Sequence, residues 1–594
     1  MAEDKTYFGL DFGTTFSTIS LLTKGGVLVY KQKGSEYIPT TLFIPEDEKY
    51  VMYGHAAESA YVTGVKGSYY KDLKRYVGCN SRNISRYLEL MKPAYEVTTS
   101  KIGNSQTDSA VIEAYNKWPN SKRNLNDLIS LFIKVIVCEV EVRLNVKCQG
   151  IILSVPAGYT CLQRAYMEEC CKASGYRCVT IINEPSAASI ATLSHLSPDH
   201  HDLLVYDFGG GTFDVSCISV YGTSVVVTGS SSDMNLGGRD IDAALSSHLS
   251  KKCGLTGQFE LQVTSLKEAL CVSPNPIKFN LKPYKDADVM VYPHEIAEIA
   301  LPFIQRSVDT VRNLIESLGF SHKKYDIALV GGSSSLPGVK SILSSLYFCN
   351  KVVPFENSRA AVSIGCSIYA KAFDSNSQLI LIDATSKDLG LASNKGNMLL
   401  LAPRAAPLPF NGKTSVTCPG KVSDSELLIY LYEGRSTRVL YNELLASTKV
   451  LCSQLGNTSQ TAIDMVVHYE TQISTTGRVT CKVSGENGVG ITIHVQSVYD
   501  FEEGRLLKLS TLNEQTQRDR LIDAISVISY RKICKDVDSR DRLVIKELSE
   551  LGQSELVGKY GLNDECLKSI SMVLRSTFPG VLRREDVSFV PFEV

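Results

Sequence analysis

Two glycine-rich segments carry the residue types that bind phosphate. Each follows an apolar run typical of a strand; they comprise Asp11, Phe12, Gly13, Thr14 and Thr15, and Asp207, Phe208, Gly209, Gly210, Gly211 and Thr212. Glycine allows positive φ and leaves backbone N–H groups open to an anion. Threonine hydroxyls can reach phosphate oxygens, and an aspartate at a strand end can face the water shell of Mg²⁺. A single copy could be an ordinary hairpin, but two matching copies favour a phosphate-binding turn that is used twice.

Three other phosphate-binding motifs are excluded. A protein kinase needs a His-Arg-Asp loop before its Asp-Phe-Gly, and none precedes either copy. The segment that begins with Gly412 and Lys413 lacks the first glycine of a Walker loop, because Pro407 stands at that position. A dinucleotide-binding fingerprint fails because Asp214 takes the place of its last glycine.

The surrounding pattern predicts the elements that position these turns. Apolar runs at 149–155 and 202–206 alternate with amphipathic stretches through about the first 370 residues, which is typical of an α/β fold. One helix is predicted from an N-cap at Thr160 to a terminating Gly175. Short runs of period two between 384 and 500 indicate an antiparallel sheet domain, and a helical period returns over 501–594.

Composition limits the classes of partner. The 62 Lys and Arg residues nearly balance the 63 Asp and Glu residues, so we expect no direct sequence-specific binding of nucleic acid. The sequence shows no signal peptide and no apolar stretch long enough for a transmembrane segment, which predicts a cytosolic protein. The 17 cysteines form no C-x-x-C pair and are expected to be reduced thiols.

Five segments resemble, in order, motifs of the heat-shock 70 kDa chaperones: 9–15, 182–188, 207–214, 236–240 and 329–333. The resemblance is close over about the first 375 residues, includes 379–383 and continues weakly into the sheet region. It implies an α/β actin-like ATPase domain of two RNase H-like lobes at 1–376 and an interdomain linker at 377–383. A β-sandwich-like, substrate-binding-like domain at 384–500 and a short α-helical C-terminal domain at 501–594 would follow.

The resemblance also implies a site for ATP and Mg²⁺. Catalytic roles would fall to Lys74, Glu184, Asp207 and Thr212, and Asp11, Asp207 and Glu184 would hold Mg²⁺ through water. Nucleotide contacts would come from a larger set, namely Asp11, Gly13, Thr14, Thr15, Gly209, Gly210, Gly211, Asp214, Gly238, Lys267, Gly331, Gly332 and Ser333. These residue types suit the task, because carboxylates can hold hydrated Mg²⁺ while a lysine compensates charge on phosphoryl oxygens.

Residue type alone leaves alternatives open at three of these positions. Lys74 could be a solvated lysine of the basic run 71–75, and Glu184 could be a turn residue before Pro185. Asp214 could be a strand residue that faces solvent.

Within the family, the chain is similar to the shorter homologues encoded by closteroviruses. The similarity rests on 154–159, on 71–75 together with Cys79, and on the shortened tail. It implies a Mg-dependent viral ATPase that is chaperone-like and acts in assembly of the virion tail and in cell-to-cell movement. The implied partners are viral coat proteins, other virion-tail proteins and host cytoskeleton; the implied locations are host cytoplasm, plasmodesmata and virion.

The chain also departs from the cellular chaperones. Thr180 replaces an arginine where J-domain cochaperones engage, so J-protein coupling is doubtful. Residues 591–594 differ from the C-terminal motif that cytosolic chaperones present to repeat-type cochaperones. On the adenosine side, 264–271 keep only Lys267 of a charged set, and Ser335 replaces an arginine. Two alternative functions therefore stay open: a general peptide-binding foldase with J-protein-stimulated ATPase, and a nucleotide-locked structural virion component without turnover.

Overall fold

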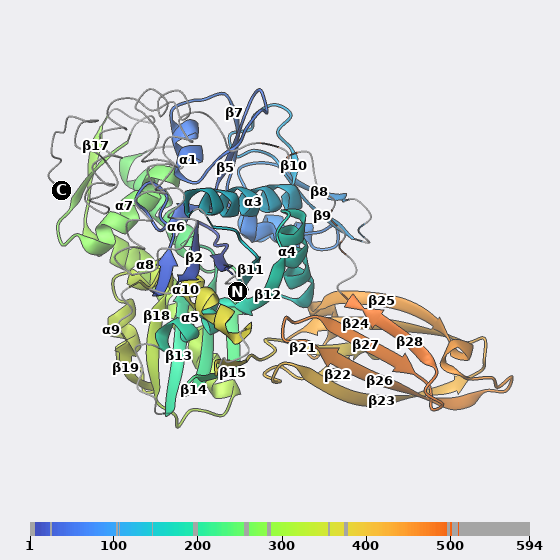
Figure 1. Ribbon diagram of the computed structural model, residues 1–594. Coiled ribbons are helices and arrows are strands. Elements are labelled where there is room, and N and C mark those ends of the chain that lie inside the picture. The colour runs from blue at the N-terminus through green and yellow to red at the C-terminus, as the bar shows by residue number, and fades with distance from the viewer. Residues whose placement is uncertain are drawn as a thin grey trace, which may run out of the picture.

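The computed structural model describes most of residues 6–509, and Figure 1 shows an α/β part followed by an all-β part. The gaps in this range are 24–25, 103–104, 106, 145, 194–199, 255–259, 282–286, 354–356, 374–377, 496–498, 500, 502–505 and 507–508. The helical domain predicted for 501–594 lies almost wholly outside the described residues.

The first lobe is built on a mixed sheet. Its strands are β1 (Tyr7–Asp11), β2 (Phe16–Thr23), β3 (Gly26–Val29), β4 (Ile38–Pro39), β11 (Gly150–Val155) and β12 (Cys178–Asn183). The strand order is β12-β11-β1-β2-β3, with β4 paired to β2. β1 runs antiparallel to β2 and parallel to β11, so the first glycine-rich turn joins the two strands of a hairpin in the middle of the sheet.

The second lobe repeats this arrangement. Its strands are β13 (His200–Phe208), β14 (Phe213–Tyr221), β15 (Ser224–Asp233), β18 (Tyr325–Val330), β19 (Cys349–Val353) and β20 (Ile380–Ile382), in the order β19-β18-β13-β14-β15-β20. β13 runs antiparallel to β14 and parallel to β18, as β1 does to β2 and β11. The second glycine-rich turn therefore occupies the same topological place as the first. The predicted strands 149–155 and 202–206 are confirmed as β11 and as part of β13.

Two helices pack between the sheets of the lobes, α5 (Glu184–Thr192) and α10 (Ala361–Tyr369). Figure 1 shows both near the centre of the α/β part. Their contact is very close, because a Cβ at Gly365 would lie 1.7 Å from the carbonyl oxygen of Ala187. Only glycine permits that approach, which brings the start of α5 to the cleft between the lobes.

The remaining helices and small sheets cover the lobes. The helices are α1 (His55–Val62), η1 (Leu73–Tyr76), α2 (Ile84–Met91), α3 (Leu125–Leu144), α4 (Cys161–Ala173), α6 (Gly238–Cys253), α7 (Glu260–Val272), α8 (Pro293–Ser317), η3 (Gly332–Ser335), α9 (Val339–Ser344) and η4 (Ala370–Phe373). The small sheets contain β5 (Leu42–Pro45), β6 (Met52–Tyr53), β7 (Gly67–Tyr70), β8 (Val97–Lys101), β9 (Asp108–Ile112), β10 (Arg123–Asn124), β16 (Ile277–Asn280) and β17 (Asp288–Val291). Thr160 caps α4 through a capping box with Gln163, as its sequence predicts, and Gly175 follows the helix with φ +89°.

The segment before the all-β part is itself a strand. β20, within the predicted linker, pairs in parallel with β15 at the edge of the second lobe. The sequence predicts only a linker here. Its short apolar run completes the sheet because it pairs with the otherwise open edge of β15.

The all-β part consists of two four-stranded antiparallel sheets that form a sandwich. The strands are β21 (Asp388–Ala392), β22 (Met398–Ala402), β23 (Phe410–Lys421), β24 (Glu426–Gly434), β25 (Glu443–Leu451), β26 (Ile463–Ile473), β27 (Val479–Ser484) and β28 (Gly490–His494); η5 (Val439–Tyr441) and η6 (Cys452–Leu455) lie in connections. One sheet has the order β22-β21-β24-β25 and the other β23-β26-β27-β28. Alternate residues of β24 and β26 are buried between the sheets, which explains the period of two in the sequence.

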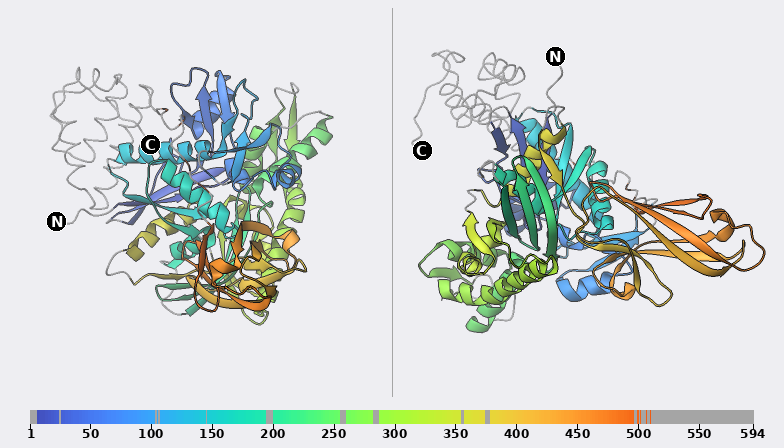
Figure 2. Two further views of the ribbon diagram at one scale, coloured as in Figure 1. Left: turned by 90° about the vertical axis from the view of Figure 1, so that its right-hand side faces the viewer. Right: turned by 90° about the horizontal axis from the view of Figure 1, so that it is seen from below.

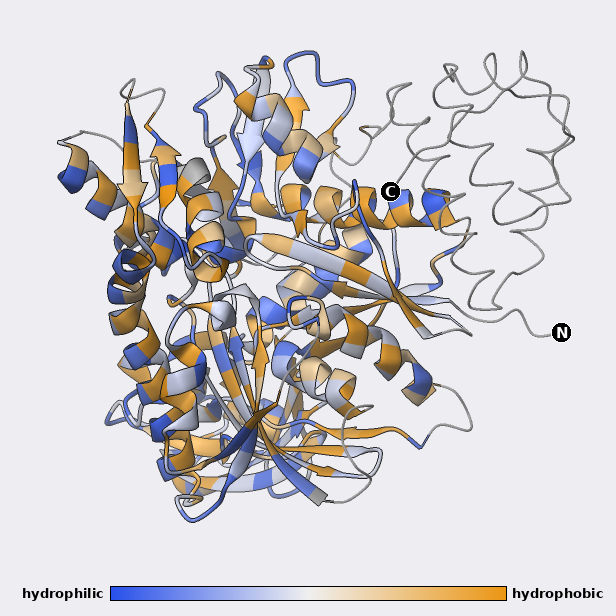
Figure 3. Ribbon diagram, turned by 90° about the vertical axis from the view of Figure 1, so that its left-hand side faces the viewer, coloured by the Kyte–Doolittle hydropathy of each residue, from blue (hydrophilic) through white to orange (hydrophobic). Residues whose placement is uncertain are grey.

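The views in Figure 2 show the sandwich projecting from one side of the α/β part. Figure 3 shows hydrophobic residues concentrated along the strands and helices of the two lobes, while many connecting loops are hydrophilic. Within the described part of the chain, no helix is long and apolar enough to span a membrane. The cysteines described there are free thiols, as predicted.

Candidate functional site

The two glycine-rich turns meet across the cleft between the lobes. A Cβ on Gly210 would lie 2.3 Å from Oγ1 of Thr15, and one on Gly211 would lie 2.7 Å from Oγ1 of Thr14. Any side chain there would force the turns apart. The repeated turns seen in the sequence are therefore two halves of one site.

Two further segments converge on the second turn. The backbone N–H of Gly238 and the hydroxyl of Ser333 both donate to the carbonyl oxygen of Gly209, at 3.0 and 2.8 Å. Gly331 has φ +79°, and a Cβ there would lie 2.7 Å from Oδ1 of Asp207. This position requires glycine for its backbone conformation and for its space.

A buried lysine and four carboxylates lie at the bottom of the cleft. Lys74, on η1, donates from Nζ to Oε1 of Glu184 at 2.5 Å, and both residues are only 6% exposed. Asp11 and Asp207 stand at the matching strand ends, and Asp214 pairs with Asp207 across the β13–β14 hairpin. The electrostatic influence of Glu184, Asp11 and Asp214 on Lys74 places all of them in one cluster.

The environment shifts the pKa values of this cluster strongly. Burial, together with the charge of Glu184, raises the pKa of Asp11 to about 7 and that of Asp214 to about 7, although Lys74 opposes both shifts. Burial and the neighbouring carboxylates also raise the pKa of Asp207 well above its usual range. At Lys74, burial disfavours the charge, but Glu184 and Asp11 outweigh it and raise the pKa. One lysine does not balance four carboxylates.

These positions resolve the alternatives left by residue type. Lys74 is buried and paired, so it is not a solvated lysine. Asp214 is 1% exposed and accepts a hydrogen bond from the N–H of Gly158, so it does not face solvent. Glu184 is the first residue of α5, with Pro185 in the helix start, and its side chain points to the cluster and pairs with Lys74.

The cluster is suited to a hydrated cation and an anion together. Among the described residues, no group of three acidic, histidine or cysteine side chains is close enough to ligate one ion directly. One buried oxygen of the first turn, Oγ1 of Thr15, has no hydrogen-bond partner within the described structure. A phosphate oxygen could accept a hydrogen bond from this hydroxyl, and a hydrated Mg²⁺ would lower the repulsion between the carboxylates.

A cavity of about 190 Å³ connects this cluster with the η3 loop. It is lined by most of the predicted residues, namely Asp11, Gly13, Thr14, Thr15, Lys74, Glu184, Asp207, Gly209, Gly210, Thr212, Gly238, Lys267, Gly331, Gly332 and Ser333. Gly211 and Asp214 do not line it: Gly211 packs on Thr14, and Asp214 lies behind the second turn.

The far end of the cavity contains groups that sequence reasoning missed. Arg359 lies 5.2 Å from the ring centroid of Tyr37 and 3.3 Å from Glu268. The predicted Lys267 is occupied by the protein itself, since its Nζ contacts Asp242 at 2.8 Å and donates to the carbonyl oxygen of Gly238. Arg359 belongs to no recognisable sequence motif. The cellular chaperones carry an arginine at the position of Ser335, and Arg359 comes from a different segment of the chain. It nevertheless supplies a planar cation at this end of the cavity.

The comparisons with known proteins agree with this architecture. The family model described as "Hsp70 protein" matches residues 7–472. The chain belongs to the Hsp70 family. It is 32% identical over 591 residues to the "Movement protein Hsp70h" of Beet yellows virus, covering 98% of this chain and 99% of that protein.

Two further relatives illustrate the range of the family, one viral and one bacterial. The "Movement protein Hsp70h" of Grapevine leafroll-associated virus 3 is 30% identical over 485 residues, with 80% of this chain and 85% of that protein covered. The "Chaperone protein HscA" of Buchnera aphidicola is 24% identical over 492 residues, with 81% and 77% covered. Membership of the Hsp70 family implies the actin-like ATPase fold and an ATP-binding, chaperone-like protein, in agreement with the two matching lobes.

Proposed function

We propose that this protein binds Mg·ATP between its lobes and hydrolyses it to ADP and phosphate. The observation that carries the proposal is the buried Lys74–Glu184 pair beside Asp11 and Asp207, at the point where the two glycine-rich turns meet. Backbone N–H groups and threonine hydroxyls of the turns would bind the phosphates. Mg²⁺, when bound, would compensate the charge of phosphates and carboxylates.

The chain's own groups have separate roles in this proposal. In the reaction, the oxygen of a water forms a bond to the terminal phosphorus and loses a proton to a phosphate oxygen or to solvent. The bond to the bridging oxygen breaks, and its electrons remain with ADP. The ammonium of Lys74 stabilises charge that builds on the phosphoryl oxygens. Glu184 keeps that ammonium in place, and the hydroxyl of Thr212 lies at the phosphate end of the cavity.

The linker offers a route from the site to the sandwich. Asp383, directly after β20, accepts two hydrogen bonds from Nδ2 of Asn183, at 2.8 and 2.9 Å, and one from Ser186 at 3.2 Å. Asn183 immediately precedes Glu184. A movement of Glu184 that follows hydrolysis would therefore disturb the contact that holds the linker against the end of β12 and the start of α5.

We place this ATPase in virion tail assembly and cell-to-cell movement. The names of the viral relatives, which are movement proteins, support this role. The proposed partners are viral coat proteins, other virion-tail proteins and host cytoskeleton, in host cytoplasm, at plasmodesmata and in the virion. Thr180, on β12, supplies no guanidinium for a J-protein, so we expect this role to be independent of J-proteins.

Two competing functions make different predictions. A peptide-binding foldase would hydrolyse ATP faster when peptide and a J-protein are added together. A nucleotide-locked structural component would bind ATP tightly without turnover. In the sandwich, Leu427 and Ile429 are buried while Leu428 is exposed, so this strand lines the sandwich core with alternate residues and favours neither alternative.

The deciding experiment is single-turnover hydrolysis of ATP by the purified full chain with Mg²⁺, with Asp207→Ala as the inactive control. We expect hydrolysis in the natural chain and its loss in the variant. Tight binding of ATP without any hydrolysis would instead identify a nucleotide-locked protein. In infected cells the same variant should fail to form virion tails or to spread, and normal spread would contradict the proposed viral role.

A further inference from the structure

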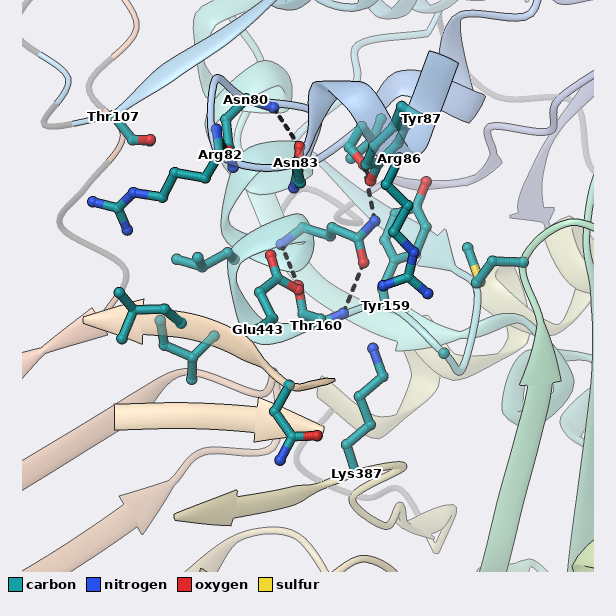
Figure 4. Close-up of a pocket in the computed structure, with 18 of the residues that line it drawn as sticks. Asn80, Arg82, Asn83, Arg86, Tyr87, Thr107, Tyr159, Thr160, Lys387 and Glu443 are labelled. Atoms are coloured by element: carbon teal, nitrogen blue, oxygen red, sulfur yellow. Dashed lines mark hydrogen bonds between the residues drawn. The ribbon is translucent and has the colours of Figure 1, made fainter. Parts of the chain in front are cut away.

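A second and larger cavity, of about 1130 Å³, lies between the α/β part and the sandwich. One wall comes from η1, α2 and the segment 158–163, and the other from residues 440–448 and 491–494 of the sandwich together with Lys387. Figure 4 shows side chains from both walls entering the space around Tyr159. The cavity therefore exists only while the sandwich is docked.

This interdomain cavity touches the nucleotide cavity at its phosphate end. Thr14, Lys74 and Thr212 line both cavities, so these three side chains form the partition between them. Lys74 is fixed on the nucleotide side by Glu184, and its backbone carbonyl accepts a hydrogen bond from the hydroxyl of Tyr159 on the other side, at 3.4 Å. A group released at the terminal phosphate position would thus be next to the interdomain cavity.

The interdomain cavity contains cations that no carboxylate neutralises by direct contact. Within the described part of the chain, neither Arg86 nor Lys387 lies within 4 Å of a carboxylate oxygen. Figure 4 shows the two side chains reaching into the cavity from opposite walls, Arg86 from α2 and Lys387 from the start of the sandwich. Glu443 is close enough to influence both residues, and Glu433, which does not line the cavity, also acts on Lys387. Among the described residues that line the cavity, Glu443 is the one carboxylate, while five are cations, namely Lys74, Arg75, Arg82, Arg86 and Lys387, so positive charge is available to an anion.

We propose that the interdomain cavity is the exit route of inorganic phosphate, and that Arg86 and Lys387 attract the anion across the partition. The inference rests on the proposed ATPase function. After hydrolysis ADP still fills the nucleotide cavity and blocks its entrance. The phosphate formed at Thr14 and Thr212 therefore leaves most directly across the partition. Because the sandwich forms one wall, its docked position controls how fast phosphate leaves.

The test separates cleavage from release in the full chain with Mg·ATP. Cleavage is followed by acid quench in a single turnover, and free phosphate by a fluorescent phosphate sensor. In an Arg86→Ala, Lys387→Met double variant we expect unchanged cleavage and release of phosphate that is slower by roughly tenfold, since a dianion loses the attraction of two nearby charges. Arg86→Lys should restore part of the rate, and Arg312→Ala on exposed α8 is the matched control.

The reverse direction provides a second readout when cleavage itself is slow. Inorganic phosphate that enters the ADP complex should slow the dissociation of ADP. In the double variant phosphate should enter more slowly, by the same factor as its release, so the slowing of ADP dissociation should take correspondingly longer to develop. Normal cleavage with unchanged phosphate exit and entry would overturn the inference and leave the ATPase intact. Absence of cleavage in the natural chain would refute the proposed function itself, and the exit route with it.

Discussion

Replacing Lys74 by alanine should separate catalysis from nucleotide binding. The ammonium is buried and lies 2.5 Å from Glu184, at the phosphate end of the cavity. We expect hydrolysis to slow by roughly 10²-fold to 10⁴-fold, the usual range for a positioned catalytic group. ATP binding should persist, because the glycine-rich turns and the far end of the cavity remain.

The same substitution should also lower the free energy of unfolding, and this effect can be distinguished from the loss of catalysis. Removing one partner of a buried ion pair costs about 3–5 kcal/mol, because the remaining charge is left without compensation. Here the remaining charge is Glu184, beside Asp11 and Asp207, whose pKa values are already raised by burial and by Glu184. Mg²⁺ with ADP should recover part of this stability, since it supplies positive charge to the cluster, but it should not recover the rate.

The assay compares single-turnover hydrolysis, nucleotide affinity and thermal unfolding of the natural chain and Lys74→Ala. Lys71→Ala is the matched control, because Lys71 belongs to the same basic run and is also buried. Unlike Lys74, Lys71 does not line the cavity, and its Nζ lies 3.8 Å from the ring centroid of Tyr115. Hydrolysis by Lys74→Ala within about threefold of the natural rate, with ATP still bound, would refute a catalytic role for this ammonium.

Three other perturbations follow from the geometry. Gly331→Ala should abolish ATP binding and lower the unfolding temperature, because the new Cβ would lie 2.7 Å from Asp207 Oδ1 at a φ of +79°; calorimetry of both variant and natural chain measures this. Arg359→Ala should weaken ATP binding about tenfold in a titration while the rate at saturating ATP stays unchanged, since the guanidinium lies away from the phosphate end. Without Mg²⁺ or nucleotide, the free energy of unfolding should fall by a few kcal/mol as pH rises from about 4 to about 7. The reason is that Asp11 and Asp214 hold protons more tightly in the folded state, each with a pKa raised to about 7. Urea unfolding across this pH range in EDTA tests the prediction.

The sequence was informative where function depends on backbone shape. Glycines at 209–211 and the matching turn at 11–15 are required by contacts within and between the turns, so their spacing predicted the site directly. The alternation of strands and helices indicated the α/β class for the same local reason, and the period of two indicated the sandwich. The viral branch of the family followed from short motifs and is supported by the relatives.

Features that depend on distant segments could not be predicted from residue type and spacing. These indicate only that Lys74 belongs to a basic run typical of a solvated surface; the family resemblance assigned it to the site, and its pairing with Glu184 of α5 shows that it is buried. Arg359 reaches the far end of the cavity from a segment without any motif. β20 appears as a linker because its pairing with β15 joins residues more than 150 positions apart in the chain.

The charge balance of the cleft explains why nucleotide, metal and lobe position should be linked. Asp11 belongs to the first lobe and Asp207 to the second. Burial, together with the charges of Glu184, Asp214 and Asp11, raises the pKa of Asp207. Closing the lobes without a cation therefore brings carboxylates together at a cost that Lys74 alone does not offset. A bound cation reverses this cost, so the closed arrangement should be favoured by Mg·ATP and weakened when phosphate departs. If the interdomain cavity carries that phosphate, the docked sandwich delays the very step that releases it, which would give the protein a long-lived docked state after cleavage.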